Sequence, residues 1–162
     1  MIKGNLIVGQ SGGPTAAINS SLAGVIKEAL RNENVEKVYG MVNGIEGLLA
    51  EKIVDLSKFT DEENLEKLIH TPSSYLGSCR YKMPTPEKDR SVYEKILQIF
   101  KKNNIRYFLY IGGNDSMDTV DKLSFYANEI DADIKFIGVP KTIDNDLMGT
   151  DHTPGFGSAA KF

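Results

Sequence analysis

The chain has 162 residues, of which 41% are hydrophobic and 25% are charged, a balance typical of a globular domain with one ordinary core. Its net charge of −3 argues against a surface that binds nucleic acid or an anionic membrane. Cys79 is the only cysteine and no apolar run could span a membrane, which excludes a disulfide and a thiolate metal cage and favours a soluble protein of the reducing cytoplasm.

The first predicted element is a buried strand at residues 6–8, a short apolar run that ends in a glycine. A Gly-rich turn at residues 10–14 leads into a helix that has Pro14 near its first turn, where a missing N–H costs nothing. A second strand is expected at residues 38–42. The stripe expected to be buried along the helix is Ile18, Leu22, Val25 or Ile26, and Ala29 or Leu30.

Two further helices are predicted from their start signals. Thr60 and Glu63 have capping-box spacing and predict a short helix, and Thr85 followed by Pro86 predicts another. The stretch between them, residues 71–85, is long and irregular, and such stretches inside a compact domain are usually functional or disordered. The apolar residues expected to be buried are Leu65, Leu68 and Ile69 in the first helix and Val92, Ile96, Ile99 and Phe100 in the second.

The rest of the chain repeats the alternation of strand and helix. Strands are predicted at residues 105–111 and 134–139, and residues 155–162 resemble the first turn of a further helix. Asp115 or Ser116 is expected to cap the helix between the two strands. The apolar residues expected to be buried in that helix are Met117, Val120, Leu123, Ala127 and Ile130. Helices between apolar strands predict an α/β fold with three layers, α/β/α, around a mostly parallel, Rossmann-like sheet.

Three polar or Gly-rich motifs each follow a predicted strand directly. They are residues 10–14 (QSGGP), 112–116 (GGNDS) and 140–146 (PKTIDND). In parallel sheets, ligands bind beyond the carboxyl ends of the strands. The three motifs should therefore lie together at one edge of the sheet and form one site.

The residue types in these motifs suggest phosphate chemistry. Gly12 and Gly13 let the backbone approach an anion at a helix start, although a tight turn without a ligand explains them equally well. Asp115 beside such a turn suggests Mg²⁺, which prefers oxygen ligands and neutralises phosphate charge. In the last motif, an aspartate could take a proton from a hydroxyl and Lys141 could hold a phosphoryl group; a solvated polar turn is the alternative.

Other phosphate and metal motifs are missing or incomplete. No Walker P-loop spacing occurs in the chain. Residues 155–160 match the loose dinucleotide fingerprint but follow no strand, so a dinucleotide site is not expected. His70 and His152 lack the spacing of metal ligands and are interpreted as surface or loop residues.

Across residues 6–162 the chain resembles the phosphofructokinase family. The resemblance is carried by the three motifs above and by residues 75–80 (YLGSCR), and the PKTIDND motif is nearly a signature by itself. The resemblance implies phosphorylation of fructose 6-phosphate at its 1-hydroxyl, giving fructose 1,6-bisphosphate in glycolysis, with Mg²⁺ in the site. It also implies that the full-length protein is a homo-oligomer that needs no nucleic acid and no membrane.

The resemblance also implies roles for individual residues. Asp144 would be the base that takes the proton of the sugar hydroxyl, and Thr142 and Asp146 would line the acceptor and phosphoryl site. Arg80 would stabilise charge on the phosphoryl group in flight. Gly12 and Gly13 would contact the donor phosphates through the backbone.

Two positions are expected to decide the phosphoryl donor, and both count among the expected catalytic residues. Family members that use ATP usually carry glycine where this chain has Asp115 and Lys141, whereas members that use pyrophosphate carry aspartate and lysine. A carboxylate about 4 Å from an α-phosphate charge costs about 4 kcal/mol at an effective dielectric of about 20, roughly a thousandfold in affinity. Pyrophosphate has no α-phosphate, and Lys141 would offset its charge, so pyrophosphate is the expected donor.

Two features depart from the family pattern. Many members have aspartate, the expected magnesium ligand, where this chain has Asn114, so Asn114 and Asp115 are both candidate ligands. Family members are also much longer, so residues 1–162 are interpreted as the N-terminal domain that binds the donor and carries catalytic groups. The C-terminal domain, which would bind the sugar phosphate, is then absent and the isolated chain should be inactive.

Three alternatives stay open at this point. The first is an ATP-dependent phosphofructokinase that tolerates both substitutions. The second is a lipid or NAD kinase, which shares a similar Gly-Gly loop but lacks the motif at residues 140–146. The third is a phosphate-binding fragment without catalytic activity.

Overall fold

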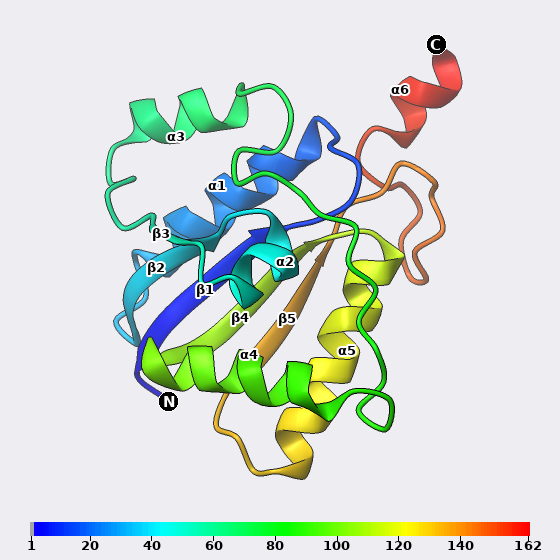
Figure 1. The fold of residues 1–162 in the computed structure, drawn as a ribbon. Helices are drawn as coiled ribbons and strands as arrows, with labels where there is room; N and C mark the ends of the chain where they lie inside the picture. Colours follow the sequence, from blue (N-terminus) through cyan, green and yellow to red (C-terminus); the bar gives the residue numbers. More distant parts are fainter. Residues whose placement is uncertain (1) are drawn as a thin grey trace.

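The structure, a computed structural model, describes residues 2–162 and is built around one five-stranded sheet. The strands lie in the order β3-β2-β1-β4-β5 (Figure 1), and β1 pairs in parallel with both β2 and β4. β5 is parallel to β4, and only β3 runs antiparallel to its neighbour. The strands are β1 (Gly4–Gln10), β2 (Val35–Met41), β3 (Ile53–Asp55), β4 (Ile105–Gly112) and β5 (Lys135–Pro140).

Helices cover both faces of the sheet, which confirms the predicted three-layer α/β/α fold. α1 and α3 lie on one face, and α2, α4 and α5 lie on the other (Figure 1). The helices are α1 (Ala17–Ala29), α2 (Gly44–Leu49), α3 (Glu62–Ile69), α4 (Arg90–Lys102), α5 (Asn114–Glu129) and α6 (Phe156–Lys161). No helix within residues 2–162 has the length and apolar character needed to cross a membrane.

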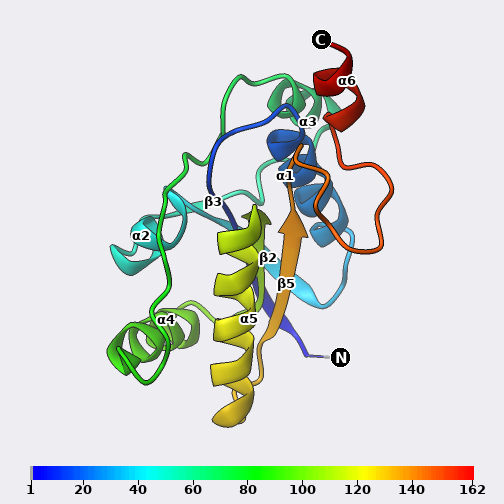
Figure 2. The same ribbon diagram turned by 90° about the vertical axis from the view of Figure 1, so that its right-hand side faces the viewer.

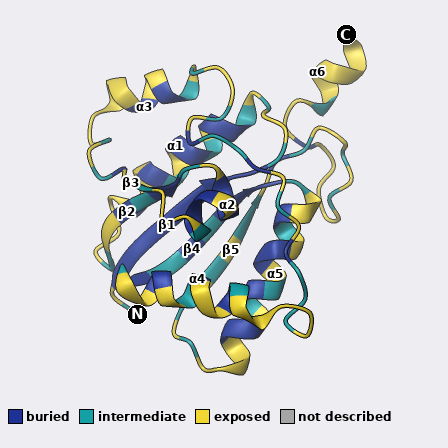
Figure 3. Cartoon of the chain, viewed as in Figure 1, coloured by how far each residue is buried: buried dark blue, intermediate teal, exposed yellow. Residues whose placement is uncertain are grey.

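The alternation of side chains along the strands divides the core into two layers. Leu6 and Val8 of β1 face α1, whereas Ile7 between them faces the opposite side with Phe108 and Phe100. Successive residues of a strand point to opposite faces, so one apolar run supplies both cores. Figure 3 shows the most completely buried residues along β1 and on the inward faces of α1, α4 and α5.

β5 is the less covered edge of the sheet. It packs against α5 and β4, but Ile137, whose Cα pairs with Leu109, is 49% exposed. Parallel strands are normally covered on both faces. Coverage of both faces, as expected from the sequence, therefore holds for the centre of the sheet and not fully for β5.

The predicted helices exist, but several of their starts were assigned to the wrong residue. α3 is capped by Asp61, whose carboxylate accepts the N–H of Asn64 at 2.7 Å, and not by Thr60. Asp89 caps α4, because the residues after Thr85 form a separate turn before the helix begins. A carboxylate cap binds first-turn N–H groups as a hydroxyl does, so neighbouring candidates are hard to rank from sequence.

Pro14 lies near the first turn of α1, as expected, in the turn that precedes Ala17. Two other local expectations were wrong. α5 is capped by Gly113 rather than by Asp115 or Ser116, which lie inside the helix. Ile130, expected to be buried, is the C-cap of α5 and is 44% exposed.

Candidate active site

The three sequence motifs meet in one polar hollow beyond the carboxyl ends of β1, β4 and β5. Its volume is about 520 Å³, and Figure 2 shows the connecting segments gathered at that end of the sheet. The hollow is lined by Ser11, Gly12, Gly13, Cys79, Arg80, Tyr81, Lys82, Gly113, Asn114, Asp115, Ser116, Lys141 and Asp144. Seven of the predicted site residues are therefore brought together here, whereas Thr142 and Asp146 do not line the hollow.

The glycine turn after β1 forms one wall of the hollow. Gly12 has φ of 74°, a left-handed conformation that favours glycine. A Cβ on Gly12 would lie 3.4 Å from Nζ of Lys141, so the turn and the lysine are in direct contact. The turn is fixed to the chain before Arg80, because Gly12 N–H donates to the Cys79 carbonyl at 3.2 Å and Ser78 Oγ donates to the Gly12 carbonyl at 2.5 Å.

The helix start that faces the hollow belongs to α5 and not to α1. Pro14, Thr15 and Ala16, which lead into α1, line a different hollow with residues 69–73. Gly113 and Asn114, at the start of the 16-residue helix α5, line the polar one. A helix start presents N–H groups without helical partners to an anion. The start of α5 therefore lines the hollow beside the glycine turn, and the expectation that Gly12 and Gly13 hold an anion stays a prediction.

Lys141 is the most enclosed charged group of the hollow, with 7% of its surface exposed. Its backbone N–H donates to the Gly112 carbonyl at 2.9 Å, and its Nζ donates to the Gly13 carbonyl. Burial, followed by the positive charge of Arg80, lowers the pKa of Lys141, and the carboxylate of Asp144 acts in the opposite direction. Removing an ammonium group from water disfavours its charged form, so this cation is poised to gain from an anionic ligand.

Asn114 and Asp115 sit in the first turn of α5 at the mouth of the hollow. Asn114 Nδ2 donates to Asp146 Oδ2 at 2.9 Å, which leaves the amide oxygen of Asn114 as the atom available to a cation. Within residues 2–162, no three His, Cys, Asp or Glu side chains cluster closely enough to form a metal cage. The residues present fit a magnesium ion that is held partly by water and phosphate, as is usual for this ion, and do not fit a cage of protein ligands alone.

The segment after β5 carries the remaining predicted residues. Asp144 lines the hollow, and its backbone N–H donates to Thr142 Oγ1 at 3.0 Å. Thr142 therefore shapes the turn that presents Asp144, and Asp146 reaches the site through its bond with Asn114. Asn145, between Asp144 and Asp146, has a left-handed φ of 58°.

Arg80 also lines the hollow, and the structure adds a cation that the sequence analysis did not single out. Lys82 lies two residues after Arg80 on the same irregular segment and faces the same hollow. All four residues from Cys79 to Lys82 line the hollow, so the usable signal was that Lys82 lies close to Arg80 in the chain. With Lys141, three cations face two carboxylates, Asp115 and Asp144, which gives the hollow a net positive side-chain charge.

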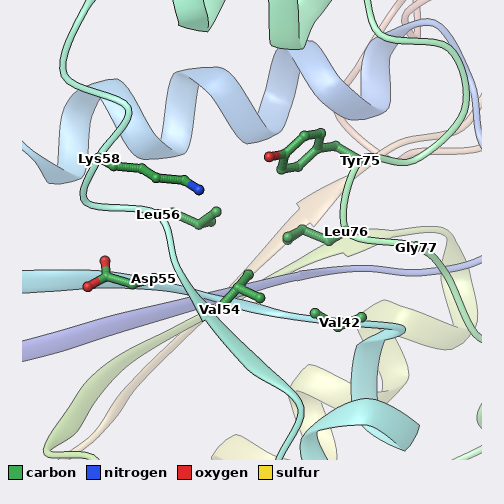
Figure 4. A pocket seen from close by; sticks show the side chains of 8 residues that line it. All are labelled: Val42, Val54, Asp55, Leu56, Lys58, Tyr75, Leu76 and Gly77. Carbon is green, nitrogen blue, oxygen red and sulfur yellow. The ribbon is translucent and has the colours of Figure 1, made fainter.

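A second hollow, of about 280 Å³, lies near β3 and shares no lining residue with the first. Figure 4 shows its walls, which are mainly apolar, with Asp55 and Lys58 to one side. Tyr75, Leu76 and Gly77 form its other side. It lacks the converging charges of the polar hollow.

Comparison with known proteins matches this chain to one family. Residues 5–162 match the family described as phosphofructokinase. The chain is 48% identical over 162 residues to pyrophosphate–fructose 6-phosphate 1-phosphotransferase of Rhodospirillum rubrum, and 49% identical over the same length to the enzyme of that name from Xanthomonas campestris. These matches cover 100% of this chain but only 39% and 38% of the two relatives.

A solved structure agrees with the sequence comparison. The crystal structure of a pyrophosphate-dependent phosphofructokinase from Nitrosospira multiformis matches with a TM-score of 0.86 and 44% sequence identity. The match covers 97% of this chain and 38% of that one. The chain thus spans well under half the length of these three relatives.

Proposed function

Because the chain belongs to the phosphofructokinase family, we propose that it forms the donor side of an enzyme that transfers a phosphoryl group from pyrophosphate to the 1-hydroxyl of fructose 6-phosphate. The observation that carries the proposal is that Asp115 and Lys141 line one hollow together with the Gly12–Gly13 turn. The relatives are more than twice as long as this chain. We call the polypeptide of that length to which this chain would belong the complete enzyme.

The proposed reaction needs a base, a fixed donor and stabilisation of the charge in flight. Asp144 takes the proton of the sugar hydroxyl, whose oxygen attacks the terminal phosphorus of pyrophosphate. The bridging P–O bond breaks and inorganic phosphate leaves with the bonding electrons. Positioning and electrostatic stabilisation dominate such transfers, which suits a hollow with three cations around its donor.

The cations and the glycine turn divide the work of holding the donor. The backbone of Gly12 and Gly13 approaches the phosphates without a side chain in the way. Burial disfavours the charged form of Lys141 and lowers its pKa. A nearby anion would therefore stabilise this ammonium group more than it would an exposed one. Arg80 offers a planar fork of N–H donors to the transferring group.

The charge on Asp115 supports pyrophosphate over ATP as the donor. Its carboxylate lines the hollow at the start of α5. A longer donor such as ATP would bring a further phosphate toward this negative group. Asp115 is exposed, and like charges about 4 Å apart near a protein surface repel by about 4 kcal/mol at an effective dielectric of about 20. The shorter donor avoids that repulsion.

Asp115 and the amide oxygen of Asn114 would hold a magnesium ion together with the donor. The ion, when bound, would neutralise part of the phosphate charge. Asp146 fixes the Asn114 amide by accepting its N–H, so this aspartate would orient a ligand and need not be one itself.

A donor exchange in the complete enzyme tests the proposal. Initial rates would be measured with fructose 6-phosphate and Mg²⁺, using either pyrophosphate or ATP. Turnover with pyrophosphate and little or none with ATP is expected. A preference for ATP would replace this proposal with an ATP-dependent reaction, and no turnover with either donor would reject the phosphoryl-transfer role.

A further inference from the structure

Two polar side chains outside the hollow, Gln10 and Asn19, are almost completely buried. Gln10 ends β1 and is 0% exposed, and Asn19 lies in the first turn of α1 and is 2% exposed. Neither lines the polar hollow. Burying an amide is unfavourable unless its hydrogen bonds are made, so the partners of these two side chains indicate what they do.

Gln10 connects the first two elements to the irregular segment that follows α3. Its Nε2 donates to the Ile18 carbonyl at 3.1 Å and to Asn19 Oδ1 at 2.9 Å. Its Oε1 accepts the backbone N–H of Leu76 at 2.9 Å. One side chain thus joins β1, α1 and a residue 66 positions further along the chain.

Asn19 uses its whole hydrogen-bonding capacity in the same network. Its Nδ2 donates to the carbonyls of Thr71 and Ser73, both at 2.8 Å. Its Oδ1 accepts from Gln10 and from the backbone N–H of Tyr75, the latter at 3.0 Å. An asparagine amide has two donors and two acceptor sites. All four are occupied here, one by Gln10 and three by the backbone of residues 71–75.

The segment that these bonds hold has no helix or strand of its own. Between His70 and Asp89 the chain is irregular, so sheet or helix bonds do not fix it. Leu76 is held on both sides, since its N–H binds Gln10 and its carbonyl accepts the N–H of Asn43 at 2.8 Å. The Leu76 side chain is buried beside β2 and β3 (Figure 4), where it closes over Gly40.

The anchored residues lead directly into the wall of the hollow. Gly77 follows Leu76, and the next two residues bind the glycine turn. Ser78 Oγ donates to the Gly12 carbonyl, and the Cys79 carbonyl accepts from Ser11 Oγ at 3.3 Å. Arg80 comes next. The position of its backbone relative to Gly12 is therefore set by two sets of bonds, the direct ones at Ser78 and Cys79 and the buried ones at Gln10 and Asn19.

We propose that Gln10 and Asn19 are positioning residues of the donor site: they fix the 71–76 segment so that Arg80 faces the phosphates held at the glycine turn. The inference rests on the proposed function. It goes beyond the donor-site residues because neither amide touches the hollow and both act through Arg80.

The test compares two matched substitutions in the complete enzyme. Asn19→Asp keeps the shape and the acceptor oxygen but turns a second oxygen toward the carbonyls of Thr71 and Ser73. Asn5→Asp is the control, because Asn5 is also buried and its Nδ2 also donates to a backbone carbonyl, that of Asn103 at 2.8 Å, at the far end of β1. Asn19→Ala, which buries no new charge, is measured as well in case the aspartate variant does not fold.

Three measurements separate positioning from general loss of stability. Hydrogen exchange of residues 75–82 should accelerate in the Asn19 variants and stay unchanged in Asn5→Asp. kcat should fall about 10- to 100-fold in the Asn19 variants, the effect of a misplacement of about 1 Å, with a much smaller change in KM for fructose 6-phosphate. In an Arg80→Ala background the same changes should lower kcat no further, because coupled residues are not additive.

Each outcome bears on one of the two claims. Unchanged exchange in 75–82, normal kcat in a folded Asn19 variant, an equal kcat loss in Asn5→Asp, or additive losses with Arg80→Ala would each overturn the positioning role. If the unmodified enzyme transfers no phosphoryl group from pyrophosphate, the proposed function fails instead. The exchange measurement alone then decides whether the network fixes the segment, and unchanged exchange rejects it.

Discussion

Two irregular segments meet at the polar hollow, and they are held in different ways. Residues 71–82 carry Arg80 and Lys82. They are bonded to the side chains of Gln10 in β1 and Asn19 in α1, and Ser78 of the segment donates to the backbone of the glycine turn. Residues 142–155 carry Asp144 and Asp146. Their hydrogen bonds shown by the structure lie within the segment, apart from the one from Asn114 and those by which the Thr153 and Gly155 carbonyls accept N–H groups of α6, the helix that follows. The first is anchored by its surroundings and the second mainly by itself.

The difference suggests a division of labour in the site. The proposed donor side is held by buried amides in the structure without any ligand, which would lower the cost of ordering it on binding. The segment with the proposed base is mostly exposed, although Thr153 in it is buried. Asn145 closes the segment, since it accepts the Thr153 N–H at 2.9 Å and donates to the Asp151 carbonyl at 3.2 Å. Segments with few buried contacts open most easily, so Asp144 should gain most of its final position from substrate and from the rest of the enzyme.

The largest expected effect follows from removing the carboxylate of Asp144, the proposed base in the exposed segment. In the complete enzyme, Asp144→Asn should lower kcat about 10²- to 10⁴-fold, the range for losing a general base. The fold should be kept, because Asp144 is exposed and its backbone bond to Thr142 survives. The measurement is the steady-state kcat of the variant, with thermal unfolding as the control that it is folded. A nearly normal kcat would contradict the role assigned to Asp144.

The next effect in size concerns donor choice at the fixed side. Asp115→Gly should raise the ratio of ATP to pyrophosphate use by up to about a thousandfold, since a repulsion of about 4 kcal/mol is relieved. Lys141→Gly should mainly damage pyrophosphate use. Both residues act on the same phosphates, so the double change should deviate from additivity.

Asp121→Gly is a matched control for this donor experiment. Asp121 is an exposed aspartate in the same helix, and a glycine in a helix costs up to about 1 kcal/mol of stability at either position. The ratio of kcat/KM values for the two donors should stay unchanged in the control. An unchanged ratio in Asp115→Gly would show that charge at this position does not select the donor.

The parts of this molecule that follow from local pattern were predictable from the sequence. The strands were located because buried strands are apolar runs, and the motifs at Gly12, Asp115 and Asp144 were brought together because parallel strands end at the same edge. α2 and β3 were not predicted, since both are short: Gly44–Leu49 has fewer than two helical turns, and Ile53–Asp55 has three residues.

The parts that depend on contacts distant in sequence were not predictable. Gln10 was seen only as part of a motif and Asn19 was given no role, because their partners in the irregular segment lie 52 to 66 residues further along the chain. A polar residue carries no sign in the sequence that it will be buried. The roles proposed for Asp144, Arg80 and the possible metal ligands remain predictions.

A smaller effect would sharpen the contrast between the two segments. Asn145 has a left-handed φ of 58°, a conformation that glycine adopts without strain. Asn145→Gly therefore removes only the two side-chain hydrogen bonds that close the segment. kcat should fall roughly tenfold through looser placement of Asp144, with little change in thermal stability because the segment is exposed. Wild-type kcat in this variant would mean that the segment is held from outside after all.

The smallest expected effect is a dependence of pyrophosphate affinity on pH that reports on Lys141. Burial lowers the pKa of this lysine below its ordinary value of 10.5, so it loses its proton at a lower pH than an exposed lysine would. Below the lowered pKa the ammonium is present and pyrophosphate is attracted; as pH rises through it, the charge is lost and affinity should fall a few-fold. The unfolded chain binds this proton more tightly, so the free energy of unfolding should rise with pH across the same window.

Lys141→Arg provides the comparison that isolates this effect. A guanidinium stays charged throughout the accessible range, so the arginine variant should lose the alkaline fall in affinity even if its overall affinity is lower. Titration of pyrophosphate itself is common to both proteins and cancels in the ratio of their dissociation constants, measured by calorimetry from neutral to alkaline pH. A ratio that does not change with pH would show that Lys141 keeps its proton in the hollow, and that the neighbouring Asp144 outweighs the effects of burial and of Arg80.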